Sequence, residues 1–407
     1  MTSRLSRLLI GALLIVSLLL RSPLLLLLDV LLLLVAAASA LWGRYCLAGV
    51  SYRRQFEADR LFCGEQVQLW VEIVNAKPLP LAWLKVEDEF PEDFAVERTE
   101  LSSASKDHRR TLTNLLSLRW YERVRRRYRL TAQRRGAYEF GPARLASGDI
   151  FGFQTRLREQ TETHTLLVYP RLVTVEELRL RLARPAGEEA ATRRIVEDPL
   201  RLAGVRDYSP GDSIRHIHWK STAHQGRLQT KVFEPGASQH LIVCVNGQTL
   251  EHAYEGVLGA HFETVLMAAA SLANAALDRC QPVGLFTNNS ARDASHRVRL
   301  PATRHATQLT RILETLAQLT HFTLMPFDQL LRLEATTLPF GASVVAVSAL
   351  ATEAIQSALL ALHDAGHPAT LVLIAAPGRV PATSLPAAIP VYVVTQDWTE
   401  LEALELG

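Results

Sequence analysis

The fifteen residues RDYSPGDSIRHIHWK, at positions 206–220, include side chains that catalyse reactions, bind metals and anchor protein interfaces. They comprise two Arg, two Asp, two His, one Trp and one Lys around a Pro-Gly pair. Pro followed by Gly is the preferred order for a type II turn, and the flanking Asp207 and Asp212 can accept backbone N–H bonds. The segment is therefore more than a simple linker, and several kinds of chemistry have to be weighed for it.

The first kind of chemistry is metal binding by histidine. If residues 213–220 are extended, they alternate strictly, so His216 and His218 share one face of the strand. Two imidazoles that point the same way could bind zinc with a third ligand such as Asp212 or His224.

The second is general acid–base catalysis by Asp212 and His218. The sequence offers no nucleophile elbow, P-loop or oxyanion-like glycine cluster to complete such a site. A metal-dependent hydrolase that uses the Asp207–His218 block is therefore the alternative hypothesis, and not the main one.

The main hypothesis for this block is a rigid structural element that also docks a partner. Arg206, Asp207, Asp212 and Arg215 would form buried bidentate pairs that fix the turn, and Trp219 would pack between domains. Trp and Arg are also frequent anchors of protein interfaces. The residues assigned to this structural or docking role are Arg206, Asp207, Tyr208, Pro210, Gly211, Asp212, Arg215, His218, Trp219 and Lys220.

The elements that must position this block begin with an apolar N-terminus. Residues 8–20 and 24–42 are strongly apolar and are joined at Arg21-Ser22-Pro23, which predicts a two-helix transmembrane hairpin over residues 1–45. No small-residue cleavage site follows the first run, which argues against a cleaved signal peptide. Excess positive charge at both outer ends predicts that both lie in the cytoplasm. The basic residues concerned are Arg4, Arg7, Arg44, Arg53 and Arg54.

The remaining chain changes pattern twice. Residues 51–170 alternate at period two and predict an antiparallel β-sandwich of about seven strands. Residues 171–235 comprise a connector and a signature block that includes residues 206–220, and the connector part, 171–200, is charged and partly helical. From 236 to 407, short apolar runs alternate with amphipathic helices, which predicts an α/β fold with a doubly wound parallel sheet, and RVRLP (297–301) adds a small antiparallel strand.

Charge and cysteine content exclude little. The net charge is only +3, which indicates no particular class of partner. Four cysteines without a CxxC pair agree with a reducing compartment. Residues 119–135 contain eight Arg and no Lys, and we interpret them as a solvated strand face in preference to a nucleic-acid or anionic-lipid site.

Three segments resemble the bacterial family called domain of unknown function 58. They are RRGAYEFGPARLASGDIFGF (134–153), LLVYPRL (166–172) and GVRDYSPGDSIRHIHWKSTAHQGRLQTKVFEP (204–235). The resemblance implies two N-terminal membrane helices, a β-sandwich and a von Willebrand factor type A-like domain. It also implies an association with MoxR-type AAA+ ATPases and no defined enzymatic activity.

Type A domains usually bind a divalent metal through a DxSxS loop after their first strand. In this sequence Asn246, Gln248 and Leu250 stand at the three ligand positions. The carboxylate and both hydroxyls that suit Mg²⁺ are therefore missing. We predict that this degenerate loop does not bind Mg²⁺ tightly.

Taken together, these features predict a membrane-anchored, non-enzymatic adaptor or scaffold at the bacterial inner membrane. Its N-terminus and soluble domains would be cytoplasmic, and it would work with a MoxR-type AAA+ ATPase in the assembly or maturation of protein complexes. No cofactor and no nucleic-acid partner are expected. A structural envelope protein that binds a polymer or lipid through its β-sandwich is a further alternative, and it requires the opposite topology.

Overall fold

The structure is a computed structural model that divides into two compact units, residues Met1–Tyr169 (unit 1) and Pro170–Gly407 (unit 2). It describes residues 15, 19–20, 23–97, 102–103, 108–150, 154–176, 197–209, 214–235, 240–252, 255–292, 297–339, 341–376, 384–397, 399 and 401–405.

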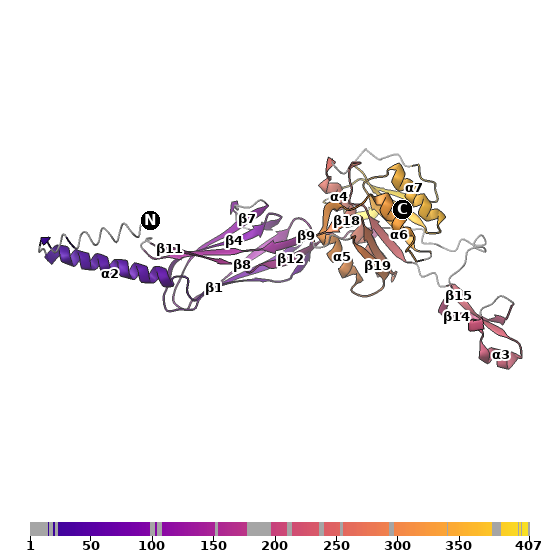
Figure 1. The fold of residues 1–407 in the computed structure, drawn as a ribbon, viewed down its shortest axis with the longest axis horizontal. Coiled ribbons are helices and arrows are strands. Elements are labelled where there is room, and N and C mark those ends of the chain that lie inside the picture. The colour runs from indigo at the N-terminus through magenta and orange to yellow at the C-terminus, as the bar shows by residue number, and fades with distance from the viewer. Residues whose placement is uncertain are drawn as a thin grey trace. The chain divides into compact units, whose positions relative to one another are not determined.

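Unit 1 begins with helix α2 (Pro23–Tyr45), which covers the second predicted membrane span (Figure 1). Its mean hydropathy is 2.7, and little of it is buried. Its 23 residues are about 35 Å long, enough to cross a bilayer by length and composition. Within the part of the chain that the structure describes, it is the one helix that meets this test. The first predicted span, residues 8–20, lies almost wholly outside the described residues.

The rest of unit 1 is built from two antiparallel sheets around one hydrophobic core, the arrangement of a β-sandwich. The alternation seen in the sequence places Leu69 and Ile73 of one sheet, and Leu84 and Val86 of the other, in this core. The first sheet has the order β1 (Val50–Phe56), β3 (Gln66–Asn75), β8 (Arg123–Ala132), β5 (Phe94–Val96). The second has the order β11 (Thr155–Gln160), β10 (Ala143–Gly148), β4 (Leu81–Pro91), β7 (Arg109–Leu118), β6 (Ser102–Ser103). A smaller sheet follows the order β2 (Arg60–Phe62), β12 (His164–Tyr169), β9 (Gly136–Phe140).

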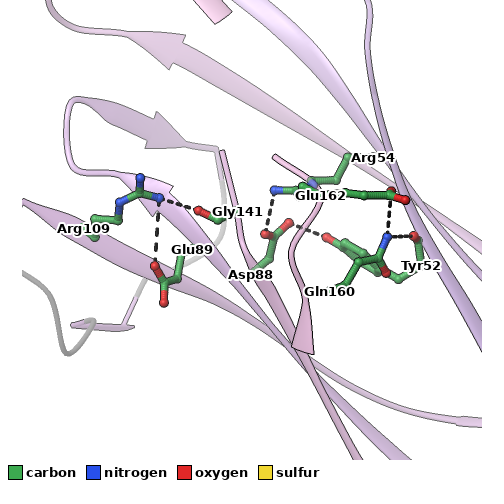
Figure 2. Close-up of polar contacts among 8 residues, drawn as sticks. All are labelled: Tyr52, Arg54, Asp88, Glu89, Arg109, Gly141, Gln160 and Glu162. Carbon is green, nitrogen blue, oxygen red and sulfur yellow. Dashed lines mark hydrogen bonds and ion pairs between the residues drawn. The ribbon is translucent and has the colours of Figure 1, made fainter. Parts of the chain in front are cut away.

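A buried polar network links the two large sheets through the core (Figure 2). Asp88 of β4 accepts hydrogen bonds from the Tyr52 hydroxyl and, at 3.0 Å, from the Arg54 guanidinium, and both donors lie on β1. Gln160 of β11 donates to the Tyr52 carbonyl at 2.9 Å. Burial raises the pKa of Asp88 from 3.8 to about 6, although Arg54 and Tyr52 each lower it. Burial and the Asp88 carboxylate raise the pKa of Tyr52 well above its ordinary value.

A second polar contact lies beside this network. Arg109 donates to the Gly141 carbonyl at 2.6 Å and lies 4.0 Å from the Glu89 carboxylate (Figure 2). The neighbouring Arg144 is 3.8 Å from the same carboxylate. The buried carboxylates of Asp88 and Glu89 in unit 1 are therefore both paired with arginine.

Unit 2 is built on a mixed sheet to which six of the described strands contribute. Five of these strands are parallel, and β19 is antiparallel to β17, which confirms the extra strand predicted near RVRLP. The order is β19 (Arg299–Thr303), β17 (Val283–Thr287), β16 (Leu241–Val245), β21 (Ser343–Ser348), β22 (Ala369–Ile374), β23 (Val391–Val394). The strands are continuous apolar runs because helices bury them.

The helices of unit 2 are α4 (Gly259–Asp278), α5 (Gln308–Gln318), α6 (Phe327–Ala335) and α7 (Glu353–Asp364). Helices α6 and α7 share a core with alternate strand residues such as Cys244 and Val344, while α4 contacts β16 and β21. Three two-stranded pairs complete the unit: β13 (Thr174–Glu176) with β24 (Ala403–Glu405), β14 (Glu197–Asp207) with β15 (Gln229–Pro235), and β18 (Asn289–Ala291) with β20 (Leu319–Thr323). Strand β14 occupies the end of the connector that was expected to be partly helical.

Candidate functional site

The signature block lies on an antiparallel hairpin formed by β14 and β15 (Figure 1). Between the two strands, the described residues form a 3₁₀ turn, Ile214–His216, and a short helix, α3 (Trp219–Gln225). Ile217 bridges to Thr230, and the His218 amide donates to the Gln229 carbonyl at 2.8 Å. The inserted segment is therefore attached to its own hairpin. Pro210, Gly211 and Asp212 lie outside the described residues, so the predicted turn is not described.

The described residues of 213–220 do not form the extended strand on which a shared face for His216 and His218 depends. The His218 side chain caps α3, because its Nδ1 accepts a hydrogen bond from the Ser221 amide at 3.0 Å. Gly226 ends the helix in the left-handed conformation, with φ of 65°. These two local capping signals override the period-two pattern. The zinc hypothesis thereby loses the shared strand face for His216 and His218 on which it was based.

The expected buried charge pairs are also corrected. Arg206, Asp207 and Arg215 are exposed. Asp207 accepts a hydrogen bond from the side chain of Gln229, and the Arg206 guanidinium donates to the Asp207 carbonyl at 3.2 Å. The buried side chains of Gln229 and Ile217 help to hold the element together, and Gln229 does so through its hydrogen bond to the Asp207 carboxylate. A short loop that leaves its arginines in water avoids the cost of desolvating them.

Instead, this element exposes both apolar and basic side chains, and we call this set of residues the hairpin surface. Trp219, expected to pack between domains, is 67% exposed, and Ile214 is 71% exposed. The other members are the apolar residues Val205 and Leu228 and the basic residues Arg206, Arg215, Lys220, Arg227 and Lys231. Asp207 is the one acidic residue among the described positions from 204 to 231. Exposed Trp with Arg is the composition of an interface core, and its charge fits an acidic partner.

A second candidate region lies at the carboxyl edge of the parallel sheet. Asn246, which follows β16, is fully buried and donates to the Ser348 hydroxyl at 2.9 Å. Its side-chain oxygen accepts from Asn288 at 3.0 Å and from the Gln248 amide at 3.1 Å. The oxygen at the metal-ligand position is thus occupied by two donors, in a network without charge. This geometry gives a reason for weak Mg²⁺ affinity, which stays a prediction.

A cavity of about 440 Å³ adjoins this network. Residues that follow the parallel strands β16 and β21 line it. The order of the strands along the chain reverses between these two strands, and open α/β sheets bind ligands at such a switch point. Its walls combine apolar side chains, such as Leu324, Phe327 and Ile355, with the carboxylates of Glu251 and Asp328. Gln248 of the degenerate loop lies on its wall. Among the described residues, no group of three or more His, Cys, Asp or Glu is arranged to hold a metal.

Sequence reasoning missed the Tyr52–Arg54–Asp88 network of unit 1. A signal was present, because Asp88 falls in register with the apolar residues Leu84, Val86 and Phe90. A carboxylate on the apolar face of a strand predicts a buried, paired charge.

Comparison with known proteins gives one related sequence of low identity and several distant folds. The chain is 24% identical over 242 residues to the "Uncharacterized protein YeaD" of Bacillus subtilis (strain 168), a match that covers 59% of this chain and 56% of that protein. The chain thus spans about half the length of that relative.

Among solved structures, the CARDB domain of the PF1109 protein from Pyrococcus furiosus covers 29% of this chain and 91% of its own, with 13% identity and a TM-score of 0.19. A cohesin module from Clostridium perfringens covers 29% of this chain and 96% of its own, with 11% identity and a TM-score of 0.20. At these scores neither supports a functional argument. Residues 204–355, which include every residue of the hairpin surface and the carboxyl edge of β16, match the family described as "Protein of unknown function DUF58".

Proposed function

We propose that this protein is a membrane-anchored, non-enzymatic adaptor whose hairpin surface docks an acidic, partly apolar protein. The observation that carries the proposal is the exposure of Trp219 and Ile214 among basic residues, on an element that opens the family match. Helix α2 supplies the anchor by its length and composition. The resemblance described above favours a MoxR-type AAA+ ATPase as the partner.

The exposed side chains and the capped histidine of this element favour docking over catalysis. The cost of leaving Trp219 and Ile214 in water is recovered only if a second surface covers them. The His218 imidazole nitrogen that faces the α3 backbone is used in capping and does not face outward as a free base. The hairpin and its caps hold these side chains on regular backbone, which reduces the entropy lost on binding.

A binding assay with matched variants tests the docking proposal. The purified full chain in detergent is titrated with the purified MoxR-type ATPase of the same bacterium, and the dissociation constant is measured. Trp219→Ala should weaken binding about tenfold or more, as expected for an interface anchor. Trp120→Ala is the control, because Trp120 is 66% exposed and lies in unit 1. Full binding by the Trp219 variant, or equal losses in both variants, would overturn the proposal.

The charge of the partner is tested separately. Arg215→Glu reverses an exposed charge of the hairpin surface, while Arg311→Glu reverses an exposed charge on α5. Because unlike charges at an interface speed association, Arg215→Glu should lower the association rate at low salt and Arg311→Glu should not. An unchanged association rate for Arg215→Glu contradicts the acidic character of the partner.

We further propose that the α/β layers of unit 2 form a von Willebrand factor type A-like domain. Numbered along the chain, the strands of its sheet run 3-2-1-4-5-6, with the third strand antiparallel. Asn246 follows the first of them, where such a domain carries its metal loop. An experimental structure superposed on type A domains tests this, and a different connection order would contradict it.

The proposed topology places the β-sheets of unit 1 and the whole of unit 2 in the cytoplasm. Arg44 in the last turn of α2, followed by Arg53 and Arg54, supports this orientation through the distribution of positive charge. A phosphatase that is active only in the periplasm, fused to the C-terminus, should be inactive. An active fusion would overturn the orientation and favour an envelope role for unit 1.

A further inference from the structure

The C-terminal end of α2 is fixed to the strands that follow it, and is not a free tether. Ser39 of the helix donates to the Asp149 carboxylate at 2.7 Å, and both residues are buried. Gly43 faces the side chain of Gln154 so closely that a Cβ there would lie 2.9 Å from the Gln154 Cβ. Lys77 donates to the Ala48 carbonyl at 2.7 Å just beyond the helix. The depth of α2 in a membrane therefore sets the position of these neighbouring segments.

The position of Ser39 shows how deep one neighbouring segment would reach. Ser39 lies six residues before Tyr45, or about 9 Å along the helix axis. Trp42 and Tyr45 are residues that prefer the membrane–water interface. If the helix is immersed to these two aromatic residues, Asp149 and the adjoining Ile150 lie about 9 Å deeper than Tyr45, near the boundary between headgroups and acyl chains. Ile150 is 61% exposed, which suits that level better than water.

A second segment beside the helix end carries exposed aromatic residues. Trp120 is 66% exposed and Tyr121 is 68% exposed, in the turn between β7 and β8. The Tyr121 amide donates at 3.2 Å to the carbonyl of Lys77, whose ammonium group binds the chain at the end of α2. Tyr121 has φ of 51°, an unfavourable conformation for a residue with a side chain. Asn75 holds the turn by donating to the Arg119 carbonyl at 2.8 Å.

Basic side chains accompany these apolar ones. Arg44 lies in the last turn of α2, Arg119 begins the aromatic turn, and Arg156 lies on β11, which contacts α2. All three are exposed. Asp149 is buried against Ser39, and Glu122 accepts a hydrogen bond from the Arg119 amide at 2.6 Å. Each basic residue close to a surface of anionic lipid strengthens association about fivefold.

We propose that these residues form a collar around the end of α2 that rests in the headgroup region of an anionic bilayer. Its members are Tyr45, Trp120, Tyr121, Ile150, Arg44, Arg119 and Arg156. Aromatic and aliphatic side chains would enter the boundary between headgroups and acyl chains, and the guanidinium groups would pair with lipid phosphates. The collar rests on the proposed function to the extent that α2 must cross the membrane. It would hold unit 1 at a fixed depth and tilt on the bilayer surface.

Quenching of tryptophan emission by brominated lipid tests the collar. The full chain is placed in nanodiscs of phosphatidylcholine and phosphatidylglycerol that carry bromine on the acyl chains near the headgroups. The emission of each tryptophan is isolated as the difference between the wild type and the matching Trp→Phe variant. Trp120 should lose most of its emission in brominated nanodiscs. Because Trp120 is exposed, Trp120→Phe leaves the fold intact.

The same measurement separates the collar from the anchor. If Trp42 is quenched and Trp120 is not, the collar is wrong and the anchor stands. If neither is quenched, α2 is not in the bilayer and the proposed anchoring fails as well. The combined change of Arg44, Arg119 and Arg156 to Gln should reduce the quenching of Trp120 in anionic nanodiscs while Trp42 stays quenched. Equal quenching of Trp120 in this variant and in the wild type would overturn the role of the guanidinium groups.

Discussion

Replacement of Arg54 by Leu should destabilise unit 1 through the carboxylate that it leaves behind. Asp88 has no exposed surface, and the Arg54 side chain is only 5% exposed. Inside the core, the Arg54 guanidinium lies 3.0 Å from the Asp88 carboxylate, and the Tyr52 hydroxyl donates a hydrogen bond to it. These two donors take the place of water around the charge. Removing one partner of a buried ion pair costs about 3–5 kcal/mol, because the other charge stays buried and uncompensated. We expect Arg54→Leu to lower the free energy of opening of β1 and β4 by about this amount at pH 8.

The loss of stability caused by Arg54→Leu should depend on pH. The pKa of Asp88 is raised from 3.8 to about 6 in the folded chain. The folded state then holds this proton more tightly than the unfolded state, so stability falls as the pH rises between these values. The loss is about 3 kcal/mol, and it is complete above pH 6 in the wild type. Arg54 lowers the pKa of Asp88, so in the Arg54→Leu variant that pKa lies higher and stability continues to fall above pH 6. The gap between the variant and the wild type should therefore widen from pH 6 to pH 8.

Hydrogen exchange on the full chain, read by mass spectrometry on peptides from β1 and β4, measures this local free energy. After correction for intrinsic exchange, Arg54→Leu should speed exchange about a hundredfold or more at pH 8. The control is Arg53→Leu, because Arg53 is the exposed neighbour on the same strand and should change stability by about 0.5 kcal/mol or less. Equal effects of the two variants, or a gap that does not change with pH, would refute the role assigned to Asp88.

Three further predictions concern unit 2. His218→Ala removes the cap of α3 and should destabilise that helix by about 1 kcal/mol, seen as faster exchange over residues 219–225, whereas the exposed His224→Ala should not. Gly247→Ala places a methyl group against the buried side chain of Asn289 and should lower the free energy of unfolding by about 1–3 kcal/mol, measured by thermal denaturation. Gly259→Ala is the control, because a methyl group there meets open space. Equal shifts in the two variants would contradict the packing argument. Calorimetric titration with Mg²⁺ should show no micromolar binding, because the Asn246 oxygen already accepts two hydrogen bonds, and a micromolar site there would contradict this account.

Much of the architecture could be predicted because it depends on periodicity. The alternation QVQLWVEIVN places Val67, Leu69, Val71 and Ile73 on one buried face of β3, as expected for a half-buried strand. Runs such as LIVCV are buried at every position, as in a parallel sheet covered on both faces. Burial of apolar surface dominates the folding free energy. Because each residue is either apolar or polar, the pattern of buried positions can be recognised in the sequence.

The candidate site was less predictable, because short-range backbone hydrogen bonds competed with the pattern. The alternation of SIRHIHWK predicts a strand, yet His218 caps a helix and Gly226 ends it. The hydrophobic gain from one short strand is small, so a few local hydrogen bonds decide its conformation. Four members of the hairpin surface, Arg206, Arg215, Trp219 and Lys220, were identified from the sequence, but their exposure was not, and the other members were missed.

By itself, the sequence determined the apolar helix α2, the strand-rich unit 1, the alternating strands and helices of unit 2, and the neutral loop at Asn246. Only the tertiary structure decided which polar groups meet. Tyr52 and Asp88 are 36 residues apart, and Ser39 and Asp149 are 110 residues apart. Such contacts depend on strand register and on the packing of whole sheets. A single buried charge must find its partner wherever the backbone places one, because water is not available to it.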